Sequence, residues 1–172
     1  MPTPAFISIT GSSQGLITEG AFTANSVGNV YQEGHENQML VQEIDHLIET
    51  PADPQSGQPS GQRVHGPFTF TSALNKASPL LYQALATGEM LPNVEVTWYR
   101  TSANGVQEAF FTTKLEDATI VSIDTALPHV QDKENAEYTQ LIKVAMAYRK
   151  IIWVHDVCGT EGSDDWRKPR EA

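Results

Sequence analysis

A candidate nucleophile, Ser13, lies within residues 11–15, where Gly-Ser-Ser-Gln-Gly matches the G-x-S-x-G pattern of hydrolases. That motif needs a strand before the serine and a helix after it, so that the hydroxyl is exposed above a parallel sheet. A β-prone run precedes the motif, but residues 16–20 are too few for a helix and end at a glycine. We therefore interpret the motif as a glycine-rich turn between two strands, and a serine hydrolase using Ser13 stays as an alternative.

The histidines and the single cysteine show no spacing typical of a metal or nucleophile site. Cys158 has no CxxC neighbour and follows an apolar run, so we expect an inert buried thiol. No HExxH motif and no pair of histidines three or four residues apart occurs among the five: His35, His46, His65, His129 and His155. The sequence therefore predicts no metal site and no cofactor.

Two pairs of adjacent acids, Glu116-Asp117 and Asp164-Asp165, are the remaining candidates for acid–base work. Neighbouring residues of a strand point to opposite faces, so Glu116 and Asp117 are not expected to converge. Asp164 and Asp165 lie in a polar C-terminal stretch. We expect all four to be solvated charges, predict no catalytic residue, and expect that the protein is not an enzyme.

Composition indicates a single globular domain with an acidic surface. The chain has 172 residues and a net charge of −10, which disfavours nucleic acid and anionic membranes as partners. No apolar run is long enough for a membrane span, so we expect no membrane insertion. The N-terminus lacks the cationic start and apolar run of a signal peptide, so any export is expected without one.

Most of the chain reads as short strands, which favours a β-sandwich or barrel. Asn104-Gly105 separates two β-prone runs and predicts a hairpin turn. Residues 39–50 fit either a helix face or a strand, and we favour the strand. The other expected strands lie at residues 6–11, 68–72, 94–101, 109–115, 118–125, 139–148 and 151–157.

One short helix is predicted over residues 79–87. Ser78 is the expected N-cap, Pro79 takes the first position, and Gly88 follows the end. Its Leu and Ala residues recur at helical spacing, so we expect that face to pack on the sheet.

Residues 51–66 form a long loop rich in proline and glycine, within the sequence PADPQSGQPSGQRVHGP. Loops of this length are uncommon in compact domains unless functional or disordered. Proline lowers the entropy lost when such a loop docks, so we favour a projecting contact arm over a flexible insertion. We place the domain at residues 1–158, followed by a polar C-terminal tail at 159–172.

Several long motifs resemble the haemolysin-coregulated protein (Hcp) family, the tube subunits of bacterial type VI secretion systems. They span the chain in order: MPTPAFISITGSSQGLITEGAF, VQEIDH, PADPQSGQPSGQRVHGPF, LNKASPLLYQALATG, LPNVEVTWYRT, TQLIKVAMAYRKIIW and GTEGSDDWRKPREA. Asn75 departs from the family, in which many members carry Asp before this lysine.

The resemblance implies a mainly β fold, with a two-sheet, barrel-like or sandwich-like domain, one flanking short helix and the long projecting loop. It further implies homo-hexameric rings stacked head-to-tail, with the sheath, spike and effector proteins of type VI secretion as partners. The protein would assemble in the bacterial cytoplasm and then be secreted. The helix would lie toward the lumen, with Tyr82, Gln83 and Thr87 as candidate lumen residues. The loop would contact the next ring through Asp53, Gln55, Ser56, Gly57, Gln58, Pro59, Ser60 and Arg63.

Elementary geometry fits a ring that carries cargo. A compact chain of this length has a radius of gyration of about 16 Å, which corresponds to a sphere roughly 40 Å across. Six equal spheres in a closed ring enclose a hole as wide as one sphere, again roughly 40 Å, which admits a small folded protein. A monomeric module that binds one partner through residues 51–66 is the remaining alternative.

Overall fold

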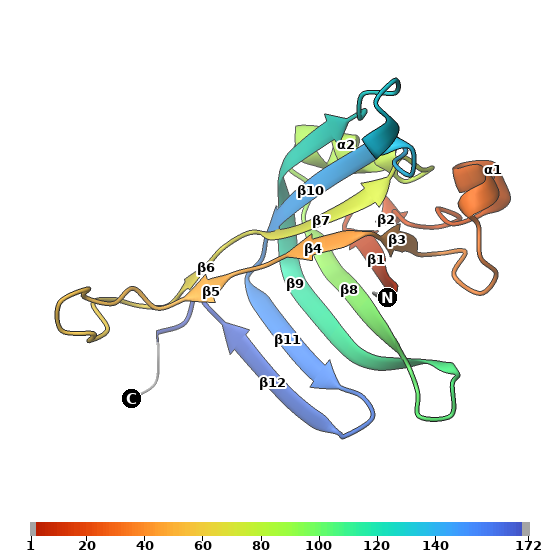
Figure 1. The fold of residues 1–172 in the computed structure, drawn as a ribbon. Coiled ribbons are helices and arrows are strands. Elements are labelled where there is room, and N and C mark those ends of the chain that lie inside the picture. The colour runs from red at the N-terminus through yellow and green to blue at the C-terminus, as the bar shows by residue number, and fades with distance from the viewer. Residues whose placement is uncertain (1–2, 170–172) are drawn as a thin grey trace.

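The computed structural model describes residues 3–169 as one curled sheet with a helix at one end and an arm that projects from it (Figure 1). The helical elements are short: α1 (Ala24–Val27), the 3₁₀ turns η1 (Gly28–Val30) and η2 (Lys133–Asn135), and α2 (Ser78–Thr87). The strands are β1 (Ala5–Gly11), β2 (Gly15–Leu16), β3 (Met39–Val41), β4 (Glu43–Asp45), β5 (Ile48–Glu49), β6 (Val64–His65), β7 (Phe68–Ala73), β8 (Leu91–Thr101), β9 (Gln107–Ala126), β10 (Leu141–Ala147), β11 (Lys150–His155) and β12 (Thr160–Asp165).

The long strand β9 belongs to both layers of the sheet. Its first part pairs with β8 on one side and β11 on the other, and its last part pairs with β10. One layer therefore runs β12-β11-β9-β8-β1, with β2 and β3 also paired to β1, and the other runs β9-β10-β7-β4. The predicted mainly β, two-sheet fold with a flanking helix is confirmed, although the sheet does not close into a complete barrel.

The core lies between the two layers and follows the alternation of the strands. Ile7 and Ile9 of β1 face it beside Val94 and Val96 of β8, and all four are fully buried. The facing layer contributes Phe68, Phe70, Ile142, Val144 and Met146. Alternate burial along each strand is the pattern that the apolar periodicity predicts.

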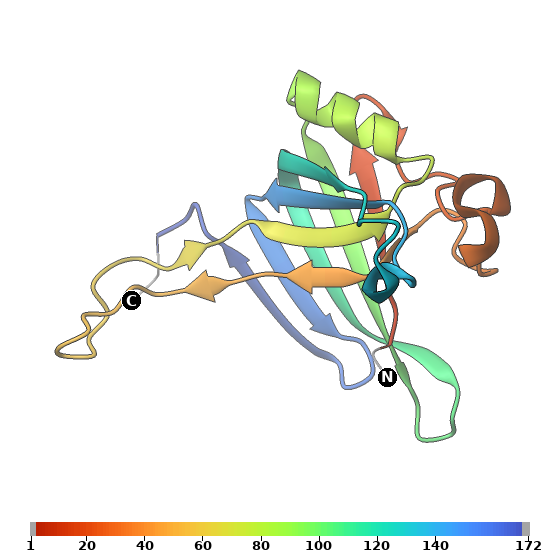
Figure 2. The same ribbon diagram turned by 45° about the horizontal axis from the view of Figure 1, so that its top comes forward.

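Helix α2 covers one end of the barrel (Figure 2). Leu81 and Ala84 are buried against the sheet, and Gly88 ends the helix with φ 66° and ψ 30°, as its place in the sequence predicts. The N-terminus differs from the prediction, because Ala77 caps the helix and Ser78 is its first residue. The reason is local: the Asn75 side chain accepts a hydrogen bond from the Ala77 N–H and turns the chain before Ser78.

Two predictions about strands need correction. Residues 109–115 and 118–125 form one strand, β9, because the chain bends at Asp117 (φ 51°) without leaving the sheet. Residues 39–50 are strands as predicted, but in three pieces, since β3 pairs with β1, β4 pairs with β7, and β5 leaves the sheet.

The last strand adds a hairpin at the edge of the sheet. Residues 160–165, placed in the tail by the sequence analysis, form β12 and pair with β11 along its whole length. Cys158 lies in the turn of this hairpin and is exposed, so the expectation of a buried thiol is wrong. The turn residues of a hairpin at a sheet edge have no layer above them to bury a side chain.

Candidate assembly surface: the projecting arm and its root

The arm comprises residues 48–65 and is an ordered hairpin. Strands β5 and β6 pair as a small separate sheet, with Ile48 opposite His65 and Glu49 opposite Val64. Beyond them the two sides remain joined by backbone hydrogen bonds of 2.8 Å each, from Ser60 N to Pro51 O, Asp53 N to Gln58 O and Gly57 N to Asp53 O. The hairpin points away from the barrel in both ribbon views (Figures 1 and 2).

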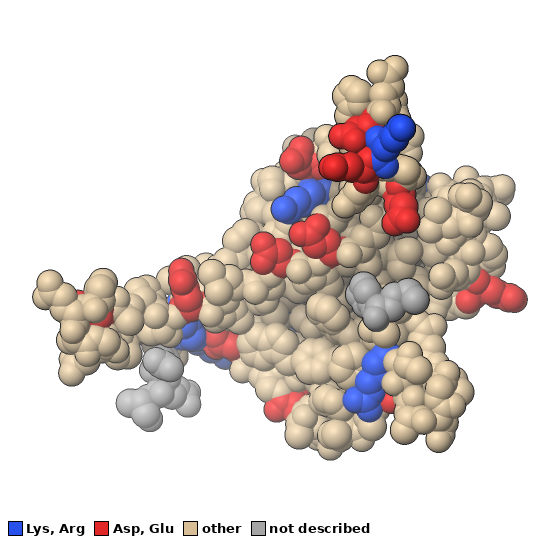
Figure 3. Space-filling model, in the orientation of Figure 1, with Lys and Arg blue, Asp and Glu red and all other residues tan. Residues whose placement is uncertain are grey.

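The tip of the arm is built by Asp53. Its carboxylate accepts hydrogen bonds from the Gln55 N–H (2.9 Å) and the Ser56 hydroxyl (3.0 Å), and these contacts lower the pKa of Asp53. Gly57 completes the turn at φ 71°. The outer arm, residues 51–62, is almost free of charge (Figure 3), since no charged residue occurs between Asp53 and Arg63.

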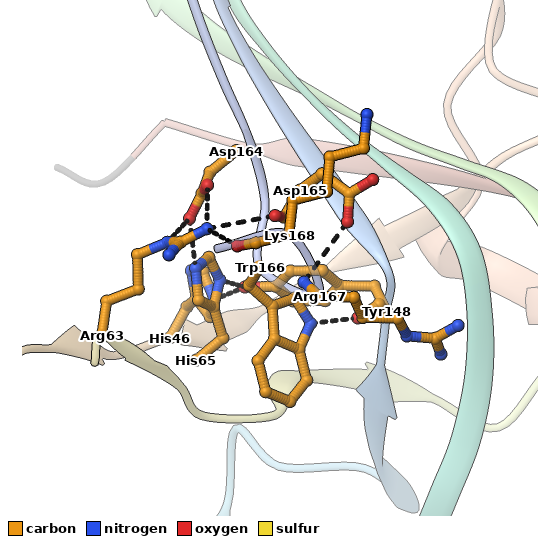
Figure 4. A network of polar contacts seen from close by, with 9 residues as sticks. All are labelled: His46, Arg63, His65, Tyr148, Asp164, Asp165, Trp166, Arg167 and Lys168. Atoms are coloured by element: carbon orange, nitrogen blue, oxygen red, sulfur yellow. Dashed lines mark hydrogen bonds and ion pairs between the residues drawn. The ribbon is translucent and has the colours of Figure 1, made fainter. Parts of the chain in front are cut away.

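Seven of the eight residues predicted to stack lie exposed on this outer arm: Asp53, Gln55, Ser56, Gly57, Gln58, Pro59 and Ser60. The eighth, Arg63, lies next to β6 at the root of the arm, which is the end that joins the large sheet. Its side chain is only 15% exposed. Its Nε and Nη2 donate to the two carboxylate oxygens of Asp164 at 2.6 and 2.8 Å, and Nη2 also donates to the carbonyls of Asp165 (3.1 Å) and Lys168 (3.0 Å) (Figure 4). This fork-to-fork pair lowers the pKa of Asp164 and raises that of Arg63.

A chain of polar side chains continues from Asp164 under the root. His65 Nε2 lies 2.7 Å from Asp164 Oδ2, His65 Nδ1 lies 2.7 Å from the Tyr148 hydroxyl, and His46 Nε2 lies 2.7 Å from the same hydroxyl (Figure 4). With both imidazoles neutral, each bond has one donor: His46 donates to Tyr148, Tyr148 to His65, and His65 to Asp164. Burial raises the pKa of Tyr148, so the hydroxyl keeps its proton.

Trp166 closes the root from the C-terminal side. Its ring stacks on His65 with centroids 5.6 Å apart, and its indole N–H donates to the carbonyl of Tyr148. This network is not predictable from the sequence, because residues 46, 65, 148 and 164 share no spacing. The aromatic residue in an otherwise polar C-terminal stretch is the one signal in the sequence that points to it.

Both acid pairs are engaged in ion pairs rather than solvated, which corrects the sequence-based expectation. Arg149 contacts Glu116 Oε2 at 3.5 Å and Asp117 Oδ2 at 2.7 Å, since the positive φ of Asp117 breaks the alternation of β9. The same guanidinium contacts Asp165 Oδ2 at 2.6 Å, and thereby ties β12 to the centre of the sheet.

The predicted lumen residues lie on the side of α2 away from the core. Tyr82, Gln83 and Thr87 are all exposed, and the Tyr82 hydroxyl bonds to Thr125 of β9. The helix is held to the sheet by its buried Leu81 and Ala84, and the three predicted residues lie on its exposed face.

The serine motif does not form a nucleophile elbow. Residues 12–14 make a tight turn from β1 into the two-residue strand β2, and the Ser13 and Gln14 N–H groups donate to Glu89 Oε1 at 2.6 and 2.8 Å. Among residues 3–169, no group of three His, Cys, Asp or Glu side chains is arranged to hold a metal ion. None of the helices in that range is both long and apolar enough to cross a membrane.

The sequence and the fold both match known proteins. The family model described as type VI secretion system effector, Hcp, matches residues 6–155. The chain belongs to the Hcp family. It is 59% identical over 169 residues to the major exported protein of Pseudomonas aeruginosa, and the match covers 98% of each chain.

Solved Hcp structures agree with this assignment. A crystal structure of an Hcp protein has a TM-score of 0.90 at 56% identity and covers 95% of this chain and 99% of that one. The secreted protein Hcp3 from Pseudomonas aeruginosa has a TM-score of 0.80 at 52% identity, with the same coverage. Hcp proteins are structural, secreted components of type VI secretion rather than enzymes, so the expectation of a non-enzyme is confirmed and the hydrolase alternative is excluded.

Proposed function

We propose that this protein assembles into homo-hexameric rings that stack head-to-tail into the inner tube of a type VI secretion system. The tube holds effector cargo in its lumen and is expelled from the cell together with that cargo. Assembly takes place in the bacterial cytoplasm, in contact with sheath and spike proteins, and export needs no signal peptide. Membership of the Hcp family supports secretion and assembly with other type VI components. The ring, its stacking and its cargo are what we propose.

The arm is the observation that carries the proposal. It is an ordered hairpin whose exposed outer part has Asp53 as its one charged residue, and the Asp53 carboxylate is already hydrogen-bonded within the turn. The rest of the outer part offers backbone and small polar groups to a partner without further charges to desolvate. Ring closure and stacking both require contacts between different faces of identical subunits, and a projecting arm supplies such a contact between rings.

The total surface of the subunit supports assembly. The chain exposes 10366 Å², whereas a compact monomer of 18.9 kDa exposes about 8300 Å². The excess reflects the arm and the two hairpins, β8–β9 and β11–β12, that extend from the barrel (Figure 1). Surface of this kind is typical of a subunit that buries its projections against copies of itself.

Deletion of Gln55–Ser60 tests the role of the arm. We expect intact hexamers, measured by light scattering, and a loss of long stacks, counted by negative-stain electron microscopy. A second variant replaces these six residues by a Gly-Ser stretch of equal length and separates the length of the arm from its sequence. Stacks as long as those of the unaltered protein in both variants would contradict the proposal, and loss of the hexamer would show that the arm acts within the ring. A lone monomer for the unaltered protein would favour the binding-module alternative.

A further inference from the structure

We infer that Arg63 and Asp164 are positioning residues that fix the direction of the arm from within the subunit. Ring stacking would then depend on residues 160–168, called the C-terminal segment below. The inference rests on the proposed function and deepens it. It also changes the role of Arg63, since the family resemblance implies that this residue touches the next ring.

The arm needs support at its root because its own strands are too short to hold it. Strands β5 and β6 pair over two residues each and are not part of the large sheet. A two-stranded ribbon of this size is marginal by itself in water. Two short links, residues 46–47 and 66–67, connect it to the barrel, and the bond from Gly66 N to Leu47 O (2.8 Å) joins them. Those links would allow the arm to swing.

The contacts of Arg63 connect the arm to the rest of the subunit across these two links, which together are called the hinge below. The guanidinium on the arm side holds the Asp164 carboxylate and the carbonyls of Asp165 and Lys168, which all belong to the C-terminal segment (Figure 4). With four hydrogen bonds made inside the subunit and a side chain 15% exposed, this guanidinium is a poor candidate for direct contact with another ring.

The C-terminal segment is itself fixed to the barrel, so it can act as a support. Strand β12 pairs with β11 along six residues, Asp165 binds Arg149, and the Trp166 indole binds the Tyr148 carbonyl. His65, which belongs to the arm like Arg63, makes a second contact with Asp164, and the His65 ring is 1% exposed.

Small rotations at the root have large effects at the tip. From Glu49 to Asp53, where the turn of the arm begins, the chain runs four residues, or roughly 13 Å at the rise of an extended strand. A rotation of about 20° at the root would move the start of the turn by roughly 5 Å, which exceeds the length of a hydrogen bond. An unbraced arm would therefore lose orientational entropy on docking that the braced arm has already lost on folding.

Distance measurements between spin labels test the brace directly. Labels at Gln55→Cys on the arm and Lys143→Cys on β10 are placed in a Cys158→Ser background, because Cys158 is exposed and would react. Labelled chains are diluted into unlabelled ones so that each distance is within one subunit. Asp164→Asn and Arg63→Gln are the test variants. Glu108→Gln is the control, because it removes a comparable ion pair, with Arg100 at 2.8 Å, from the β8–β9 hairpin.

We expect a narrow distance distribution for the unsubstituted protein and for Glu108→Gln, and a broad one for both test variants. Without labels, the test variants should keep the ring mass and lose long stacks. Glu108→Gln is the control for the label distances alone, because the β8–β9 hairpin is itself one of the projections proposed to be buried in assembly. Unchanged distributions in Asp164→Asn would overturn the inference, whether or not stacks are lost. Broadened distributions with stacks of normal length would also overturn it.

Failure of the proposed function gives a different result. If the unsubstituted protein forms no stacks under any condition, the tube proposal fails, and the label distances alone decide whether Arg63 and Asp164 brace the arm. Arg63→Lys tests whether misfolding causes the loss of stacks, because lysine keeps the positive charge but cannot make the two parallel hydrogen bonds to the Asp164 carboxylate. It should give the ring mass of the unsubstituted protein with an intermediate distance distribution.

Discussion

Asp164 and Asp165 are adjacent in β12, yet they stabilise different parts of the molecule. Asp164 points to the root of the arm and binds Arg63 and His65, whereas Asp165 binds Arg149 near the centre of the sheet. Alternation along a strand explains why neighbours reach opposite sides. The sequence shows the alternation but not the partners, because those depend on which elements lie beside β12.

Tyr148→Phe tests the polar chain beneath the arm. Tyr148 is 2% exposed, and loss of its hydroxyl leaves one ring nitrogen of His46 and one of His65 without their partner. We expect the free energy of unfolding to fall by about 1–3 kcal/mol, measured by urea denaturation at fixed protein concentration. Tyr138→Phe, at a position 62% exposed, is the control and should change stability by less than about 0.5 kcal/mol. Equal stability of the two variants would show that the hydroxyl contributes nothing.

The half-buried His46 makes stability depend on pH. Burial, together with the nearby His65, lowers the pKa of His46 from 6.5, against a smaller opposing effect of Asp45. The unfolded chain therefore takes up this proton before the folded chain does, and stability falls as the pH drops below about 6.5. Urea midpoints measured between about pH 7.5 and 5.5 should fall less in His46→Gln than in the unsubstituted protein. The exposed His129→Gln should retain the full pH dependence. An unchanged slope in His46→Gln would contradict this account.

At the scale of elements, the sequence predicts best where local physics decides the structure. The strands of the core, the hairpin at Asn104-Gly105 and helix α2 follow from alternation, turn chemistry and a Gly at the helix end. Residues 39–50 are harder, since they change partners twice within twelve residues. The two-residue strands β5 and β6 have no periodicity to detect, and β12 is too polar to resemble a strand. Each of these depends on long-range pairing rather than on its own residues.

Gly88→Ala tests the end of α2. Gly88 has φ 66°, and no atom lies within 4 Å of the position that a Cβ would take, so the cost is confined to the backbone. We expect a loss of about 1–2 kcal/mol in the free energy of unfolding, from urea denaturation. Gly61→Ala is the control, because its φ is not positive and its surroundings are equally open. A similar loss in both variants would mean that left-handed strain is not the cause.

At the scale of the whole molecule, the site could be predicted only in part. Proline and glycine content indicates the arm, and its order and exposure agree with that prediction. The root could not be predicted, because it joins four segments from β4 to β12 that only the fold brings together. Arg63 shows the difference: its sequence position places it in the arm, and its contacts place it in the root.

The mass of the protein in solution shows whether the subunits form a hexameric ring. Six copies of an 18.9 kDa chain total about 113 kDa, and light scattering coupled to gel filtration separates that mass from a monomer without reference to shape. We expect a single species at the hexamer mass, with ring-shaped particles in the same fraction. A monomer peak that persists as the protein concentration is raised would show that the protein does not form the proposed ring.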